Sequence, residues 1–285
     1  LLPVPYFHVV FTLPQELNRL CLYMPKPLYN ILFKVAWQVI HDFGNNPKFL
    51  GARSGMIAVL HTWGQNLSLH PHLHCIVPGG GLTPSGRWKP VKHRGKYLFP
   101  VKAMSKVFRA RFVSQLRKEP NLEMLSGFYN SLFKKPWVVY CKRPFLGPEQ
   151  VIEYLGRYTH KIAISNHRIQ DVGNGSVTFS MKDYRHGGKR SSMCLPDAEF
   201  IRRFALHILP KGFVRIRHYG MLSSYHKRQN LAELKKTLDP VRLKEKPPLL
   251  HNICPKCRQG HLITITTFTA RGPPKYWIDQ LHTPQ

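Results

Sequence analysis

The sequence predicts an α+β fold, in which antiparallel strand pairs share a core with amphipathic helices. Aromatic and β-branched runs at 5–13 and 55–63 predict strands, and the chain returns at 72–77 to complete a hairpin. Apolar residues at helical spacing predict helices over 28–43 and 102–118. Hydrophobic residues make up 43% of the 285 residues, which is enough for a sizeable core and excludes wholesale disorder.

The second half of the chain continues this mixture and then changes composition. A helix is expected over 148–158, because Pro148 suits a first helical turn. Alternating segments at 161–165, 168–172 and 177–181 predict a three-stranded meander, and a helix follows over 196–209. The region after Leu222 is rich in Lys and Arg and ends in a small Cys/His cluster. We therefore divide the chain into a folded domain, 1–225, and a basic tail, 226–285.

The charge balance predicts a polyanionic partner. The chain has 43 Lys and Arg against 14 Asp and Glu, a formal net charge of +29. Nucleic acid is the expected partner, because neutralising phosphates releases counterions, and an anionic membrane surface is the alternative. No transmembrane span or signal peptide is apparent. The scattered single cysteines indicate reduced thiols and a cytoplasmic protein.

A histidine-rich strand predicts half of a metal site. Alternate side chains of a strand point to opposite faces, so His72 and His74 share one face while Leu73, Cys75 and Val77 enter the core. A metal needs at least one further ligand. His61 is the first choice because it ends the neighbouring strand, and Gln65 and His70 are alternatives. Imidazole ligands alone suit Zn or Mn better than Mg.

Two tyrosines four residues apart predict a pair of nucleophiles. Tyr154 and Tyr158 would lie on one face of a helix. A phenol attacking a phosphodiester forms a covalent phosphotyrosine, and it needs activation because its ordinary pKa is near 10. The alternative is that one or both tyrosines pack in the core with the hydroxyl group hydrogen-bonded.

In series, these motifs resemble the two-tyrosine HUH endonucleases, and more closely the IS91-type rolling-circle transposases. The resembling segments cover most of 1–225 and are Tyr6-Phe7-His8-Val9-Val10-Phe11-Thr12-Leu13-Pro14, His61-Thr62-Trp63-Gly64-Gln65-Asn66-Leu67, His70-Pro71-His72-Leu73-His74, Val77-Pro78-Gly79-Gly80-Gly81, Tyr154-Leu155-Gly156-Arg157-Tyr158-Thr159-His160, Ile164-Ser165-Asn166 and Phe213-Val214-Arg215-Ile216-Arg217-His218-Tyr219-Gly220.

The resemblance implies a central antiparallel sheet flanked by helices, an HUH or ferredoxin-like nuclease core with the histidine pair on a central strand. It implies that 1–225 is the catalytic domain. It further implies that His72, His74 and a third polar ligand hold Mg or Mn, which polarises a phosphate of single-stranded DNA. One tyrosine would become linked to the 5′ phosphate, and the second would serve strand transfer or termination.

The same resemblance shows one departure. Full-length relatives carry a Cys/His-rich zinc-binding segment before the first strand, and the present sequence starts at Leu1 without it. We therefore expect a fragment or processed form that cleaves poorly or recognises transposon ends poorly.

Basic residues near these motifs predict contacts with DNA phosphates. The candidates are Arg157, His160, Lys161, Arg185, Lys189 and Arg190. In the tail, four residues offer a zinc site, and the alternative for them is a tail with free thiols: His251, Cys254, Cys257 and His261.

The expected function is therefore a DNA transposase, acting on single-stranded transposon ends and target DNA in the bacterial cytoplasm near the nucleoid. No membrane partner is expected, and the oligomeric state is left open. The rival interpretations are a truncated, non-catalytic DNA-binding remnant and a rolling-circle replication initiator with the same chemistry. A metallohydrolase that uses water is a further rival, for which the chain offers few acidic ligands.

Overall fold

A computed structural model of the chain describes residues 2–92, 97–120, 122, 124–141, 151–152, 156, 163–183, 187, 189–225, 234, 238 and 257. The chain divides into two compact units, Leu1–Val241 and Arg242–Gln285. Every helix and strand described below belongs to the first unit. The domain boundary expected between 225 and 226 stays a prediction.

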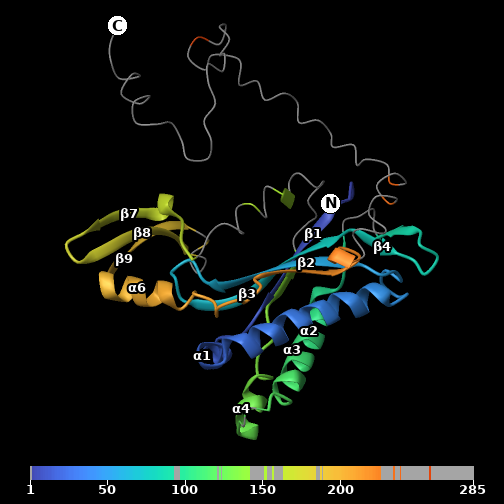
Figure 1. The fold of residues 1–285 in the computed structure, drawn as a ribbon, viewed down its shortest axis with the longest axis horizontal. Helices are drawn as coiled ribbons and strands as arrows, with labels where there is room; N and C mark the ends of the chain where they lie inside the picture. Colours follow the sequence, from blue (N-terminus) through green and yellow to red (C-terminus); the bar gives the residue numbers. More distant parts are fainter. Residues whose placement is uncertain are drawn as a thin grey trace. The chain divides into compact units, whose positions relative to one another are not determined.

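The core of the first unit is a five-stranded sheet in which every neighbouring pair is antiparallel (Figure 1). In spatial order its strands are β10 (Ile216–Gly220), β2 (Gly55–Trp63), β3 (Leu69–Pro78), β1 (Tyr6–Thr12) and β6 (Val139–Cys141). The predicted α+β fold with a central antiparallel sheet is confirmed, and the histidine strand β3 is its middle strand.

One face of this sheet is apolar, and helices cover it. Phe7, Val9 and Phe11 of β1 and Leu73 and Cys75 of β3 are almost fully buried in the main hydrophobic cluster. Since alternate residues of a strand face opposite ways, the histidines of β3 point to the other face. The sequence pattern of β3 therefore separates a core face from a face that is available for chemistry.

The covering helices are α2 (Pro25–Asn45) and α3 (Val101–Leu116), which lie beside each other under the sheet in Figure 1. Their buried side chains include Leu32, Phe33, Phe108 and Phe112, which join the main cluster. Helix α2 extends beyond the predicted 28–43 and includes Gly44. A Cβ on Gly44 would approach Ala52 O to 3.3 Å, so the helix packs closely on the chain at this position. Shorter helices complete this layer: η1 (Gln15–Leu17), α1 (Asn18–Tyr23) and α4 (Ser126–Ser131).

A second sheet forms the meander: β7 (Ile169–Gly173), β8 (Ser176–Asp183) and β9 (Lys189–Pro196), followed by helix α6 (Asp197–Ala205). The predicted strand at 161–165 was wrong for the described residues 163–165. Ala163 has a φ of 56°, a left-handed conformation that interrupts an extended chain. The third strand is β9 instead, and it buries Leu195. A short helix η3 (Asn166–Arg168) leads into β7.

A two-stranded ribbon, β4 (Gly80–Leu82) and β5 (Trp88–Pro90), follows β3. The glycine run permits a close backbone approach, since a Cβ on Gly81 would lie 2.6 Å from Arg53 O. Within the described residues, no helix has both the length and the apolar character needed to cross a bilayer.

Candidate metal centre and its surroundings

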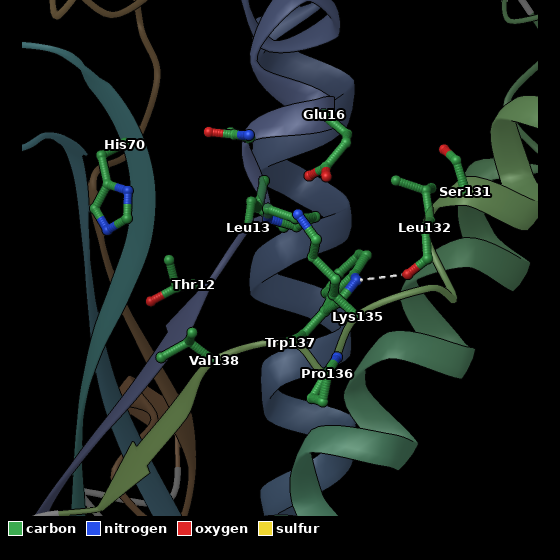
Figure 2. A pocket seen from close by; sticks show the side chains of 12 residues that line it. Thr12, Leu13, Glu16, His70, Ser131, Leu132, Lys135, Pro136, Trp137 and Val138 are labelled. Atoms are coloured by element: carbon green, nitrogen blue, oxygen red, sulfur yellow. Dashed lines mark hydrogen bonds between the residues drawn. The ribbon is translucent and has the colours of Figure 1, made fainter.

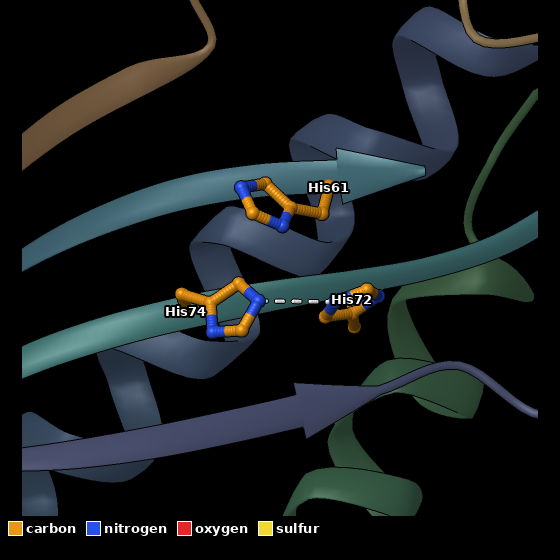
Figure 3. Close-up of side chains that lie close together, drawn as sticks. All are labelled: His61, His72 and His74. Atoms are coloured by element: carbon orange, nitrogen blue, oxygen red, sulfur yellow. Dashed lines mark hydrogen bonds between the residues drawn. The ribbon is translucent and has the colours of Figure 1, made fainter. Parts of the chain in front are cut away.

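Three histidines meet on the face of the sheet opposite the helices α2 and α3. His61 comes from β2, and His72 and His74 come from β3, where His61 is the register partner of His72. Figure 3 shows the three rings turned toward one another. One ring nitrogen from each lies within 4.8 Å of the others. Gln65, the alternative third ligand, instead lines a separate pocket described below.

Burial keeps the two β3 imidazoles, His72 and His74, neutral. Desolvation lowers the pKa of His72 to about 4 and holds the pKa of His74 well below its ordinary range. A neutral imidazole offers a lone pair, which a metal ligand requires. His70, the other alternative ligand, lies at the start of β3 with an exposed side chain. Partial desolvation of its ring by neighbouring groups lowers its pKa.

Hydrogen bonds orient the two β3 rings. His72 Nδ1–H donates to the carbonyl oxygen of His70 at 2.6 Å, which leaves His72 Nε2 as an acceptor. His72 Nε2 lies 3.1 Å from His74 Nε2, so a proton or a cation must lie between two atoms that would otherwise repel each other. This arrangement fits a divalent metal that takes the place of a shared proton. Three nitrogen ligands match transition metals better than Mg, and they leave further coordination positions open.

A fourth histidine contacts this group from β1. His8 is buried, and its Nε2 lies 2.8 Å from His74 Nδ1, with the two rings stacked at 5.0 Å. It fills the outer position that orients many metal-bound histidines. The sequence analysis missed this residue. Its signal was present, since His8 and Val10 alternate with the core residues Phe7, Val9 and Phe11.

The tyrosines fall outside the described residues, as do Arg157, His160, Lys161 and Arg185. Val151 is described: it is helical, fully buried and packed in a cluster with Tyr6, Ile57 and Ile76. Ile76 is two residues beyond His74 on β3, and it therefore lies on the same face of the sheet. Val151, which is three residues before Tyr154 in the sequence, is therefore in a cluster on the histidine face.

A pocket of about 360 Å³ opens beside the metal centre, at the end of β1 (Figure 2). Thr12, on its wall, is the register partner of His72. Figure 2 shows His70 on one side of the pocket and Ser131 and Leu132 on the other, where Trp137 Nε1–H donates to Leu132 O at 3.0 Å.

Of the predicted phosphate contacts, the structure describes two. Lys189 and Arg190 are exposed at the start of β9, and Arg190 lines a basic pocket with Arg168 and Lys182, which the sequence analysis did not select. In the tail, Cys257 is exposed and lies in a turn. The other three tail residues proposed for zinc lie outside the described residues: His251, Cys254 and His261.

Fold and site together define an α+β protein with a three-histidine centre on the sheet face opposite α2 and α3. Residues 55–230 match the family Y2_Tnp, described as "Putative transposase". This match covers more than half of the chain, and the chain belongs to that family. The resemblance to IS91-type transposases is confirmed at this level.

Two curated relatives carry transposase names. The "Putative transposase y4qJ" of Sinorhizobium fredii is 40% identical over 309 aligned residues, covering 97% of this chain and 77% of that protein. The "Transposase for insertion sequence element IS801" of Pseudomonas savastanoi pv. phaseolicola is 29% identical, covering 77% of this chain and 55% of that protein. The chain thus spans about half the length of the second relative.

Solved structures of the conjugative relaxase TrwC with DNA also match. One covers 81% of this chain and 71% of TrwC, with 11% sequence identity and a TM-score of 0.31. A second, with mutant OriT DNA, gives the same coverage and TM-score at 10% identity. Because the TM-score is only 0.31, these matches do not show where site residues lie in this chain.

Proposed function

We propose that this protein is a transposase that cuts and rejoins single-stranded DNA through a tyrosine, assisted by a divalent metal at His61, His72 and His74. The observation that carries the proposal is the convergence of three imidazoles on the face of the sheet opposite α2 and α3, in a member of a transposase family. Mn or a similar transition metal suits this nitrogen donor set better than Mg.

The bound metal would polarise the scissile phosphate and stabilise the charge that develops on it. The chain's own residues set the conditions for this chemistry. The His70 carbonyl and His8 orient the two β3 imidazoles, and burial keeps them unprotonated at neutral pH. The pocket at Thr12 and His70 leaves room for a nucleotide beside the centre.

The covalent step is a transesterification. The phenolic oxygen of Tyr154 or Tyr158 forms a bond to phosphorus, and the bond from phosphorus to the 3′ oxygen breaks. The phenol gives up its proton, and the departing 3′ oxygen gains one as a free hydroxyl. The 5′ end stays on the protein as a phosphotyrosine, and attack by another 3′ hydroxyl reverses the step and joins a new strand. Two tyrosines allow two such transfers.

The position of Val151 supports this assignment. Val151 belongs to the same buried cluster as Ile76 on the histidine face, and only two residues separate it from Tyr154. Three residues of fully extended chain span at most about 11 Å, so Tyr154 starts from an anchor on the reactive side of the sheet.

The assignment extends to the rest of the chain. Residues 1–225 form the catalytic domain, and 226–285 form a basic tail with a small zinc site at His251, Cys254, Cys257 and His261. The substrates are single-stranded transposon ends and target DNA in the bacterial cytoplasm, near the nucleoid. The net charge of +29 supports a polyanionic substrate.

A labelling experiment tests this function. Purified protein, MnCl₂ and single-stranded DNA spanning an end of the element are combined, and the products are separated on a denaturing gel. DNA labelled on the 3′ side of the cut should migrate with protein, while DNA labelled on the 5′ side should migrate as a shorter free strand. The adduct should disappear in the Tyr154→Phe/Tyr158→Phe variant and in His72→Ala. Salt-sensitive binding without any adduct would instead identify a non-catalytic DNA-binding protein.

A further inference from the structure

A basic pocket lies between the β7–β9 sheet and the loop that joins β2 to β3. Its volume is about 210 Å³. Among the described residues, its wall has four basic side chains and no carboxylate: His167, Arg168, Lys182 and Arg190, together with Gln65, Ser180 and Met181. The chain has only 14 acidic residues, so basic side chains are common on its surface. This pocket differs from a chance group of them because its charges converge from three separate elements.

Two of these charges directly oppose each other. Lys182 of β8 and Arg190 of β9 are register partners, and both are exposed. Like charges at opposed positions of an antiparallel pair destabilise a sheet. Within the part of the chain that the structure describes, no carboxylate forms an ion pair with either residue. An anion bound between them would remove this repulsion.

Arg168 fixes the floor of the pocket. Its Nε–H donates to Ser180 O at 2.8 Å, its NH2 group donates to Gln65 O at 2.5 Å, and its guanidinium lies 5.7 Å from the centre of the Phe179 ring. These contacts hold the guanidinium in one orientation while leaving it further N–H donors for a ligand. Burial lowers the pKa of Arg168, which shows that its charge is partly desolvated.

The pocket is tied to the metal centre through the β2–β3 loop. Three successive carbonyl groups of this loop accept hydrogen bonds from side chains outside it: Gln65 O from Arg168, Asn66 O from Arg203 and Leu67 O from His207. The loop starts after Trp63, whose ring stacks on His61 at 4.5 Å. Gln65 is four residues from His61, a span of at most about 14 Å. A distance of about 14 Å equals the length of about four stacked nucleotides along one DNA strand.

We propose that this pocket binds one backbone phosphate of the single-stranded DNA substrate, within a few nucleotides of the phosphate at the metal centre. The assignment rests on the proposed function for its substrate. Arg168 supplies a fixed planar donor and Lys182 and Arg190 supply charge, the combination by which proteins hold phosphates. The pocket thereby sets the register of the strand relative to His61, His72 and His74.

The test compares two variants with equal loss of charge. Lys182→Gln/Arg190→Gln alters the pocket, while Lys102→Gln/Lys106→Gln alters two exposed lysines on α3, which covers the opposite face of the main sheet. Binding of a fluorescein-labelled oligothymidylate of about 20 nucleotides is followed by anisotropy in EDTA at several NaCl concentrations. Loss of one phosphate contact should weaken binding about fivefold at 0.1 M salt and make the log–log salt slope shallower by about 0.7.

The α3 variant should change the affinity and the salt slope by clearly less. Thermal melting should show that the pocket variant is as stable as the wild type or more stable, because a repulsion has been removed. If both variants lose the same affinity, or if only duplex DNA binding responds, the pocket assignment is wrong.

The covalent assay separates this proposal from the proposed function. The pocket variant should still form the tyrosine adduct at saturating DNA and need a higher DNA concentration to do so. If the wild-type protein forms the adduct but the pocket variant and the α3 variant bind DNA equally well, the pocket assignment is wrong and the tyrosine chemistry stands. Wild-type protein that binds through the pocket but forms no adduct would refute the tyrosine chemistry and leave the pocket intact. Wild-type protein that does not bind single-stranded DNA would refute both.

Discussion

Replacing His8 should weaken metal binding although His8 is not itself a ligand. Its Nε2 lies 2.8 Å from His74 Nδ1. When His74 Nε2 coordinates a metal, the proton of His74 must be on Nδ1, and His8 is placed to accept it. In His8→Ala that acceptor is lost, so His74 loses both its preferred tautomer and the ring stacked against it at 5.0 Å.

The expected size of the effect follows from comparable outer partners of metal ligands. Losing such a partner costs about 10- to 100-fold in affinity, or about 1.4–2.7 kcal/mol. His74 is the central ring of the group, since its ring centre lies 4.4 Å from that of His61 and 4.8 Å from that of His72. Misorienting His74 therefore disturbs the contacts with both other ligands.

Isothermal titration of Mn²⁺ or Zn²⁺ into purified protein measures this effect directly. The matched control is Val10→Ala, because Val10 is the register partner of His74 on the same face and offers no hydrogen bond. His8→Ala should lose at least tenfold in affinity and Val10→Ala less than threefold. Nitrogen-15 spectra of the imidazoles should show His74 protonated on Nδ1 in the metal-bound wild type. Equal affinities in the two variants, or Nε2–H on His74 with metal bound, would refute this reasoning.

Three further results are expected. Gly81→Ala should lower the unfolding free energy by about 1–3 kcal/mol in urea melts, because its Cβ would lie 2.6 Å from Arg53 O. Gly127→Ala, with nothing within 4 Å, should be neutral or slightly stabilising, and equal losses would refute the steric argument. Burial lowers the pKa of His207, so its contribution to stability is complete above pH 6.5 and declines as the pH falls below that value. The urea midpoint should therefore fall less between pH 7.5 and 5.5 in His207→Asn than in wild type, and parallel declines would contradict this.

The strands of the main sheet could be predicted because their pattern is local. The alternation around His72 and His74 separates the face that packs on the helices from the histidine face within one segment. Strand β2 was predicted at its observed bounds. The choice of His61 as the partner of this pair followed from the hairpin alone, since its two strands are joined by a short loop. A local pattern and a short connection were enough to anticipate the three-histidine group.

Features that depend on long-range pairing were not predictable in the same way. His8 meets His74 only because β1 inserts between β3 and β6, an order that no local pattern specifies. Strand β9 was missed because its polar, serine-rich start resembles a loop, and its strand character comes from pairing with β8. The basic pocket likewise joins the β2–β3 loop to η3, β8 and β9, and the separation between Gln65 and Arg168 is 103 residues.

Peptide mapping of the DNA-linked protein tests the central claim most directly. Trypsin cuts after Arg157, so Tyr154 falls in the peptide 143–157 and Tyr158 in 158–161. After reaction with single-stranded DNA and Mn²⁺, followed by nuclease digestion, mass spectrometry should find a nucleotide on one or both of these peptides. The modification should disappear in His72→Ala. A nucleotide found on any other peptide, or cleaved DNA with no modified peptide, would contradict a tyrosine-dependent transposase.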